Sequence, residues 1–287
     1  MTAVPKRDEL RAHLVRTLIA GDVATPRQNN LKHYRRMAAG DSYYRFGLEF
    51  ERAWTERTVL EMMVERCGVV SDPRHVFGDD TIDPDITIAM LEAMGERIGL
   101  AARRRENVVI ATGHPATLTP LYQAVARALA ASGCRVLTPA AGWTYEVQPS
   151  WGGAELRRIV YAEGGVAMLE GDDGRAHHTH DPHPMEAVLR ALAAGNDGGI
   201  TALDDLADAK PDVWPDLAIA DHGWAGAAGQ AGIDTVGFAD CNDPALFAGA
   251  AEGKIDVVVP LDDGVSPHHY APLTAYILDC AGLSAAG

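Results

Sequence analysis

Cysteines are few in this sequence, and basic side chains are outnumbered. The cysteines lie far apart and form no CxxC pair, so neither a zinc site nor a disulfide framework is indicated, and a reducing compartment suits them. Lysine and arginine number 25 against 40 aspartates and glutamates, which gives a formal net charge of -15. Such an acidic chain is a poor partner for nucleic acid or anionic membranes unless its basic residues are strongly clustered. The cysteines are Cys67, Cys134, Cys241 and Cys280.

Long apolar runs are also missing from the sequence. No stretch reaches the length of a membrane span, and residues 1–15 carry charges throughout where a secretory signal would have an apolar core. We therefore expect a soluble cytoplasmic protein that binds neither membranes nor nucleic acid. A small anionic substrate remains compatible with the charge, provided that a local basic group or a bound cation offsets the negative field.

What the sequence does contain is a pattern of short apolar runs between residues 217 and 267, each ending in a carboxylate. Runs this short are typical of strands buried on both faces of a parallel sheet, and the Ala/Gly-rich stretches between them favour return helices. Ligands of such sheets bind beyond the carboxyl ends of the strands, so we expect the terminal acids to share one crevice. The runs are 217–220, 235–239 and 256–261, followed by Asp221, Asp240, and the pair Asp262 and Asp263.

The rest of the chain predicts an α/β fold with a Rossmann-like, doubly wound, mostly parallel sheet. Residues 1–102 are expected to form a helical region without a convincing strand, packed on an α/β sheet domain over 103–287 as one integrated domain. A glycine pair and an Asp-Gly turn within 156–180 predict a small antiparallel excursion. Helices are expected at 7–20, 48–67, 83–101, 119–131, 183–194 and 271–282, further strands at 107–111 and 135–138, and a polar loop at 195–215.

Acids forced together at strand ends repel one another, and a divalent cation usually stabilises such a cluster. Magnesium or manganese suits these oxygen ligands. Asp240 and Asp243 have an alternative role as caps of a helix starting at Pro244, which we favour for Asp243. Asp221, followed by His222 and Gly223, favours a functional role, whereas Asp262 and Asp263 fit a turn equally well.

A second candidate is the loop after the strand at 107–111. A strand that leads through a glycine into a helix N-terminus presents backbone N–H groups and a helix dipole suited to phosphate. The loop lacks the Lys-Ser/Thr of a P-loop and the third glycine of a dinucleotide fingerprint. His114 is a candidate general acid or nucleophile, although a lone loop histidine is more often packing. The phosphate-binding candidates here are Thr112, Gly113 and Thr117.

Two further polar segments stand out. In residues 177–183, His178 and His180 would project from one face of a strand at a spacing that metal sites use. Because the segment follows a predicted surface hairpin, we interpret it as a solvated loop or a flap that faces substrate, and not as a zinc site. In residues 27–36, a basic and amide-rich loop is predicted to fold over the crevice and pair with phosphate. Its candidate residues are Arg27, Asn29 and Asn30.

Four segments also resemble an actinobacterial family labelled "phosphatase": GDVATPRQNNLKHYRR, DHGWAGAAG, ADCNDPAL and PLDDGVSPHHYAP. The resemblance covers almost the whole chain and implies phosphoester hydrolysis, but it carries over no catalytic residue set. The chain shows none of the motifs DxDx(T/V), RHG and Cx5R, which mark the haloacid-dehalogenase, histidine and tyrosine phosphatases.

The leading hypothesis is a hydrolase that releases phosphate from a small phosphomonoester with a divalent metal, Mg²⁺ or Mn²⁺. The alternatives are a lyase, isomerase or transferase on a phosphorylated or carboxylated metabolite, and a small-anion-binding module without turnover. The N-terminal helices either wrap the sheet or form a homodimer surface, and no pattern separates the two. The candidates are Asp221, His222 and His114 for catalysis, Asp221, Asp240, Asp262 and Asp263 for metal, and Thr112, Gly113, Thr117, Arg27, Asn29, Asn30 and Asn242 for substrate.

Overall fold

The computed structural model describes residues 3–148, 152–194 and 213–283. Its centre is a nine-stranded mixed sheet in the order β11-β10-β9-β3-β7-β6-β5, with β4 beside the start of β3 and β8 beside β7. Strands β11, β10, β9, β3, β4 and β7 are parallel, and β5, β6 and β8 run antiparallel to their neighbours. The strands are β3 (Asn107–Ala111), β4 (Arg135–Val136), β5 (Thr144–Val147), β6 (Glu155–Ala162), β7 (Val166–Gly171), β8 (Ala176–His177), β9 (Leu217–Asp221), β10 (Asp234–Ala239) and β11 (Val257–Pro260).

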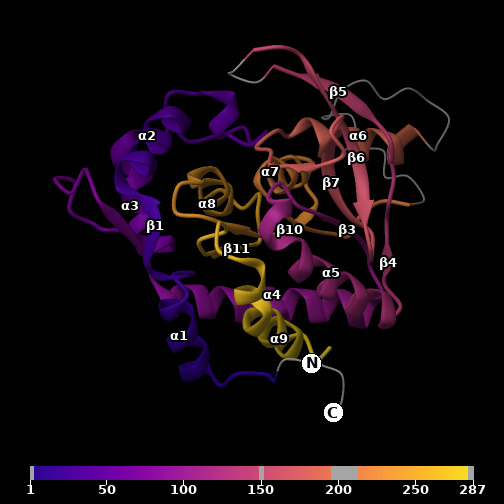
Figure 1. The fold of residues 1–287 in the computed structure, drawn as a ribbon, viewed down its shortest axis with the longest axis horizontal. Coiled ribbons are helices and arrows are strands. Elements are labelled where there is room, and N and C mark those ends of the chain that lie inside the picture. The colour runs from indigo at the N-terminus through magenta and orange to yellow at the C-terminus, as the bar shows by residue number, and fades with distance from the viewer. Residues whose placement is uncertain (1–2, 149–151, 195–212, 284–287) are drawn as a thin grey trace.

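Helices cover both faces of this sheet (Figure 1). Helices α4, α5 and α9 lie on one face, whereas α7 and α8 lie on the other, with α6 packed against α7. The core between these layers is made of aliphatic side chains that come from the strands and from the apolar faces of the helices. The helices are α4 (Pro84–Arg104), α5 (Pro115–Ala131), α6 (His183–Ala194), α7 (His222–Gln230), α8 (Pro244–Ala251) and α9 (Ala271–Cys280), with the 3-10 turns η1 (Ser42–Tyr44) and η3 (Pro267–Tyr270).

The N-terminal region corrects one expectation, because it contains strands. β1 (Gly21–Pro26) pairs antiparallel with β2 (Asp79–Ile82), although more than fifty residues separate them in the chain. Both strands are short and rich in aspartate and threonine, so neither shows the alternation of apolar and polar residues that indicates a strand. The helices of this region are α1 (Arg7–Arg16), α2 (Arg27–Ala38) and α3 (Glu56–Arg66).

The predicted helix at 48–67 is too long at its start. Residues 48–55 are not helical, and α3 begins after Thr55, whose hydroxyl accepts a hydrogen bond from the Thr58 amide. The helix predicted to open at Asp83 is confirmed, since the Asp83 carboxylate accepts from the Asp85 amide and Pro84 occupies the first turn. A local cap therefore sets the start of both helices, and the sequence pattern predicts the start of α4 but not that of α3.

The strands predicted around residues 107–111 and 217–261 are confirmed, as is the antiparallel excursion. The excursion is also joined to the central sheet: β7 pairs in parallel with the end of β3, at Ile110 and Ala111. β7 therefore extends beyond the carboxyl end of β3, and β8 leads the chain back toward that end. The polar loop predicted at 195–215 lies mostly outside the described residues. Within the described part of the chain, none of the helices has the length and apolar character of a membrane span.

Candidate functional site

The carboxylate of Asp221 holds together the ends of β3 and β9. Its Oδ1 accepts hydrogen bonds from the Gly113 amide, at 2.6 Å, and lies 2.7 Å from Nδ1 of His222, while its Oδ2 accepts from the Thr112 hydroxyl at 2.8 Å. Asp221 is fully buried, and although burial opposes its charge, these donors lower its pKa. Both oxygens are thus occupied by protein groups. The expectation that Asp221 ligates a metal directly does not fit this arrangement.

His222 presents its other ring nitrogen to two further acids. Its Nε2 lies 3.3 Å from Oδ2 of Asp243 and 3.5 Å from Oδ2 of Asp263. Burial opposes charge on the imidazole, but Asp243 and Asp221 outweigh it and raise the pKa of His222 well above its usual value. The backbone of His222 has a φ of 49°, in the left-handed region that non-glycine residues seldom adopt. Such strain is found at functional sites, where surrounding contacts hold it in place.

The favoured role of Asp243 as a helix cap is wrong for its side chain. Asp243 does occupy the N-cap position of α8, but its carboxylate makes no capping hydrogen bond. It faces His222 instead, and its Oδ1 is buried without a hydrogen-bond partner. Burial opposes the negative charge, yet the neighbouring His222 lowers the pKa of Asp243. A buried, ionised and half-satisfied carboxylate of this kind is suited to a cation.

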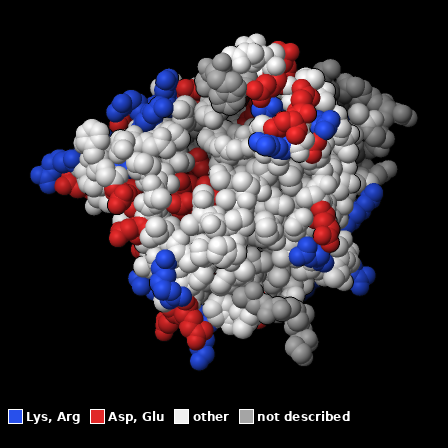
Figure 2. Space-filling view, in the orientation of Figure 1, with Lys and Arg blue, Asp and Glu red and all other residues white. Residues whose placement is uncertain are grey.

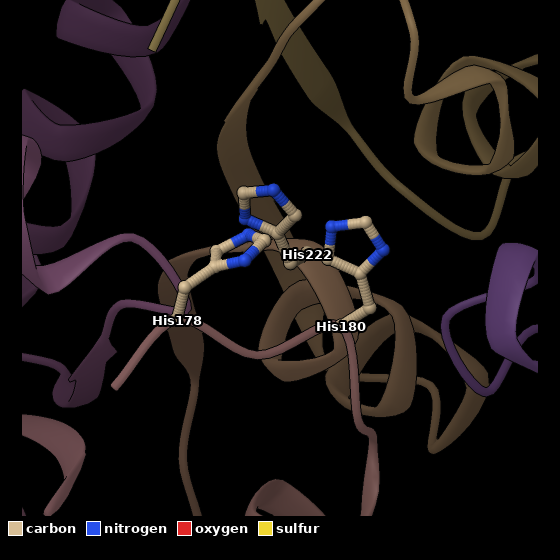
Figure 3. Close-up of side chains that lie close together, drawn as sticks. All are labelled: His178, His180 and His222. Carbon is tan, nitrogen blue, oxygen red and sulfur yellow. The ribbon is translucent and has the colours of Figure 1, made fainter. Parts of the chain in front are cut away.

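The interpretation of residues 177–183 as a solvated loop is wrong for its centre. The amide of Thr179 donates to the Gly113 carbonyl at 2.9 Å, which fixes the segment against the end of β3. His178 and His180 extend from this segment to the same side, toward His222 (Figure 3). His180 is buried, with its Nδ1 unpartnered, whereas His178 is exposed. The spacing of two that places both histidines on one face is therefore used at the site itself.

Two glycines allow this close approach. A Cβ at Gly113 would overlap the Thr179 carbonyl, and a Cβ at Gly223 would overlap the carbonyl oxygens of His180 and Asp181. Larger residues at either position would push the histidine segment away from the ends of β3 and β9. Glycine at these positions is thus required by the site and not by a turn.

Further acids, Asp240, Asp262 and Asp263, follow the ends of β10 and β11. Asp240 accepts from the Thr25 hydroxyl at 2.6 Å and from the Cys241 amide at 2.6 Å, and Asp262 accepts from the Gly264 amide at 2.8 Å. Burial and the charge of Asp262 raise the pKa of Asp240 to about 7. Burial also raises the pKa of Asp263 well above its usual value. Asp262 thus makes the predicted turn contact and belongs to the acid cluster as well.

His114 is oriented by Thr117. The Thr117 hydroxyl donates to the Asp263 carbonyl at 2.5 Å and lies 2.6 Å from Nδ1 of His114. Because this hydroxyl has a single proton, Nδ1 of His114 carries its own proton and donates to Thr117. The Nε2 atom of His114 then faces the cluster as an acceptor, 3.7 Å from Oδ1 of Asp263. Burial and the neighbouring His222 lower the pKa of His114.

Three groups of these side chains place their ligand atoms within 4.8 Å of one another. We call them the histidine group (His178, His180 and His222), the mixed group (His222, Asp243 and Asp263) and the carboxylate group (Asp240, Asp262 and Asp263), and together the His/Asp cluster.

The donors of the His/Asp cluster fit metal ions. The unpartnered atoms Nδ1 of His180 and Oδ1 of Asp243 show that its buried polar groups are not satisfied by protein alone. The carboxylate group offers the oxygen ligands that Mg²⁺ and Mn²⁺ prefer, whereas imidazoles also suit zinc and iron. Acidic side chains line a hollow in the face shown in Figure 2. Most Lys and Arg side chains of this face lie toward the edge of the molecule and not in the hollow.

The phosphate cradle predicted at residues 112–117 does not form as expected. The Gly113 amide donates to Asp221, and the His114 amide donates to the Thr112 hydroxyl at 2.9 Å. Thr112 itself is buried and bonded to Asp221. The loop therefore supports Asp221 and orients His114, and its first amides are not free to bind phosphate.

The predicted arginine cover is also wrong. Arg27 begins α2 and is fully buried, where its guanidinium pairs with Asp80 at 2.8 Å and donates to the His75 carbonyl at 3.0 Å. Asn30 is buried beside it and donates to the same Asp80 oxygen and to the Cys241 sulfur. These residues join α2 to β2. Asn29 and Asn242 are half-buried, and the Asn242 carbonyl lies 2.8 Å from Nδ1 of His33.

Replacing Arg27 by Met should therefore affect stability and not substrate binding. Removing one partner of a buried ion pair leaves Asp80 unpaired, which costs about 3–5 kcal/mol of unfolding free energy. Urea denaturation measures this loss. The matched control is Arg35→Met, because the exposed Arg35–Glu56 pair contributes less than about 1 kcal/mol. Equal losses of unfolding free energy in the two variants would show that the buried ion pair stabilises the protein no more than the exposed pair does.

Sequence reasoning brought together Asp221, His222, His114 and the acids after β10 and β11. It left His178 and His180 between a solvated loop and a flap that faces substrate, did not count them among the site residues, and missed Thr25, which reaches Asp240 from β1. The alternating histidines were the available signal for the first two. No sequence signal was available for Thr25, because its position depends on β1, a strand that the sequence pattern does not predict.

Comparison with known proteins agrees with the resemblance seen in the sequence. A family model described as "Phosphatase" matches residues 5–285. A Streptomyces coelicolor protein named "Phosphatase SCO2771" is 46% identical over 281 residues, which cover 97% of each chain. These matches extend over the whole His/Asp cluster and both faces of the sheet. The chain therefore belongs to the family described as Phosphatase.

Proposed function

We propose that the chain hydrolyses a small phosphomonoester and that divalent cations held by the His/Asp cluster assist the reaction. The observation that carries this proposal is the convergence of histidine and aspartate ligand atoms at one edge of the sheet. Family membership supports the reaction class. The order β4-β3-β9-β10-β11 supports a doubly wound, Rossmann-like sheet, in which ligands bind where the strand order reverses, here between β3 and β9.

We assign the carboxylate group to Mg²⁺ or Mn²⁺ and the histidine group to a second cation for which imidazole is a good ligand. Divalent cations at such sites neutralise charge on phosphoryl oxygens and lower the pKa of water. Asp221 acts as a positioning residue, because its contact with Nδ1 directs Nε2 of His222 toward Asp243 and Asp263. A carboxylate behind a ligating histidine fixes the ring and raises its basicity.

The chain also offers a proton acceptor at the cluster. With its Nδ1 proton bound to Thr117, His114 presents an unprotonated Nε2 toward Asp263. We assign His114 as the general base that would take a proton from the attacking water. The leaving oxygen, on the opposite side of the phosphorus in an in-line displacement, would take its proton from solvent. Thr117 holds the ring in this orientation.

The direct test is release of inorganic phosphate from a panel of phosphomonoesters, measured with Mg²⁺, Mn²⁺, Zn²⁺ or EDTA. Cation-dependent release would support the proposal. Consumption of substrate without phosphate release would instead support a lyase, isomerase or transferase. Ligand-induced thermal stabilisation without any turnover would support the binding module.

Replacing Asp221 by Asn is expected to lower turnover and cation affinity by about 10- to 100-fold, the usual effect of losing the partner behind a metal-binding histidine. Asn is close in shape but is a weaker, neutral acceptor for His222. Phosphate release and isothermal titration calorimetry with cations measure the two effects. The control is Asp216→Asn at the opposite end of β9, where the carboxylate accepts from the Asn107 amide and from no other group that the structure describes. Unchanged turnover and cation affinity in Asp221→Asn would refute the proposed site.

A further inference from the structure

A pocket of about 480 Å³ lies beside the histidine group. This volume is within the range of roughly 300–1,000 Å³ that is typical of small-molecule sites. His180 is common to the pocket wall and to the histidine group. The pocket therefore adjoins the His/Asp cluster through this shared side chain. The wall includes Tyr43, Arg45, Gly47, Glu49, His180 and His183.

Tyr43 offers this pocket an aromatic surface. Its side chain is 55% exposed, and its ring centroid lies 4.8 Å from that of His180, with the ring planes tilted by 30°. The edge contact with Tyr44, at 5.1 Å, further holds the ring. The His180 ring in turn stacks on His222 at 4.9 Å. An exposed aromatic side chain held at the mouth of a pocket is a platform for a planar ligand group.

The rest of the wall offers polar groups to the edge of such a ligand. Arg45 makes no ion pair with any described residue, and its Nε donates a long hydrogen bond of 3.4 Å to the Met37 carbonyl. Its guanidinium carbon lies 5.5 Å from the Phe50 ring, so the side chain is held by packing. Glu49 and Ser42 add acceptors, and the hydroxyl of Ser42 is also a donor. The pocket thus combines donors and acceptors with an aromatic surface.

We propose that this pocket receives the leaving group of the substrate, and that this group carries a planar ring with polar edge atoms, as in a nucleoside monophosphate. The inference rests on the proposed hydrolysis at the His/Asp cluster and names its substrate class. The ring stacks on Tyr43, and its edge atoms meet Arg45 and Glu49. An open-chain phosphate such as glycerol phosphate would reach the cluster but leave Tyr43 and Arg45 without a partner.

The test compares nucleoside monophosphates with glycerol phosphate in wild type, Tyr43→Ala and Tyr43→Phe. Loss of one stacked ring should raise KM for the nucleoside monophosphates about tenfold, with little change in kcat. KM for glycerol phosphate should not change, and Tyr43→Phe should behave as wild type. Arg45→Met should likewise raise KM for the nucleoside monophosphates alone. Thermal midpoints verify that the variants fold.

The outcomes separate this inference from the proposed function. Hydrolysis of glycerol phosphate but of no nucleoside monophosphate would overturn the substrate class and leave hydrolysis standing, as would an equal change in KM for both substrates in Tyr43→Ala. If no phosphomonoester is hydrolysed, the proposed function fails, and calorimetry with a nucleoside monophosphate tests the pocket directly. Binding that Tyr43→Ala weakens supports the pocket, and equal or absent binding overturns it.

Discussion

Replacing Asp263 by Asn is expected to lower kcat/KM for phosphate release by more than about 100-fold, beyond the loss that follows removal of a supporting residue. Asp263 belongs to both the mixed group and the carboxylate group, so the change weakens two sets of ligands at once. Its Oδ2 faces His222 and its Oδ1 faces His114, which places it between the proposed metal ligands and the proposed base. No other carboxylate of the cluster has this position.

Cation binding by calorimetry and phosphate release measure the effect of Asp263→Asn. The fold should tolerate the change without added cation, because burial disfavours the charged form of Asp263 and Asn is neutral and close to it in shape. Asp172→Asn, on the exposed turn between β7 and β8, is the control and should match wild type. If Asp263→Asn retains wild-type cation affinity and turnover, then the carboxylate group is not the metal site.

The second large effect is expected from a single methyl group at Gly223. In Gly223→Ala, the new Cβ would overlap the carbonyl oxygens of His180 and Asp181, and both partners are backbone that cannot rotate away. We expect a loss of about 3 kcal/mol in unfolding free energy, at the upper end for overpacked sites. The displaced segment should also carry His178 and His180 away from His222, so cation affinity falls in the protein that remains folded.

Gly229→Ala is the matched control for this prediction. Gly229 lies near the other end of α7, where a Cβ would overlap the Lys254 carbonyl and the Ile255 side chain. Urea denaturation should show a comparable loss of stability, but calorimetry should show unchanged cation affinity. Equal cation affinity in both variants would mean that the histidine segment does not contribute ligands.

The sheet and the acids at its edge were predictable because their signals are local. Short apolar runs that end in Asp221 and Asp240 identify buried parallel strands, and the geometry of such sheets brings their ends together. The histidine segment was not predictable in this way. Its position depends on β7, which pairs with β3 only at Ile110 and Ala111 and so extends past the end of that strand. No pattern within residues 156–180 predicts that β7 is displaced along β3 in this way.

The misassigned side chains have a common physical cause. Arg27 occurs in a basic, amide-rich segment that suggests a phosphate-binding loop, and Asp243 occurs in a segment that suits a helix cap. Their actual roles depend on partners distant in the chain: Asp80 for Arg27 and His222 for Asp243. Local sequence sets the position of a residue within an element, but tertiary packing decides which group its side chain meets.

The ligand atoms of the His/Asp cluster come from segments that are far apart in the chain, after β8, β9, β10 and β11. An unfolded chain therefore has no preformed arrangement of these ligand atoms, and the proposed affinity for cations would exist only in the folded state. Under the proposed function, the free energy of cation binding is thus added to the free energy of folding. The concentration of free metal ions in the surroundings would then determine how much of the protein stays folded.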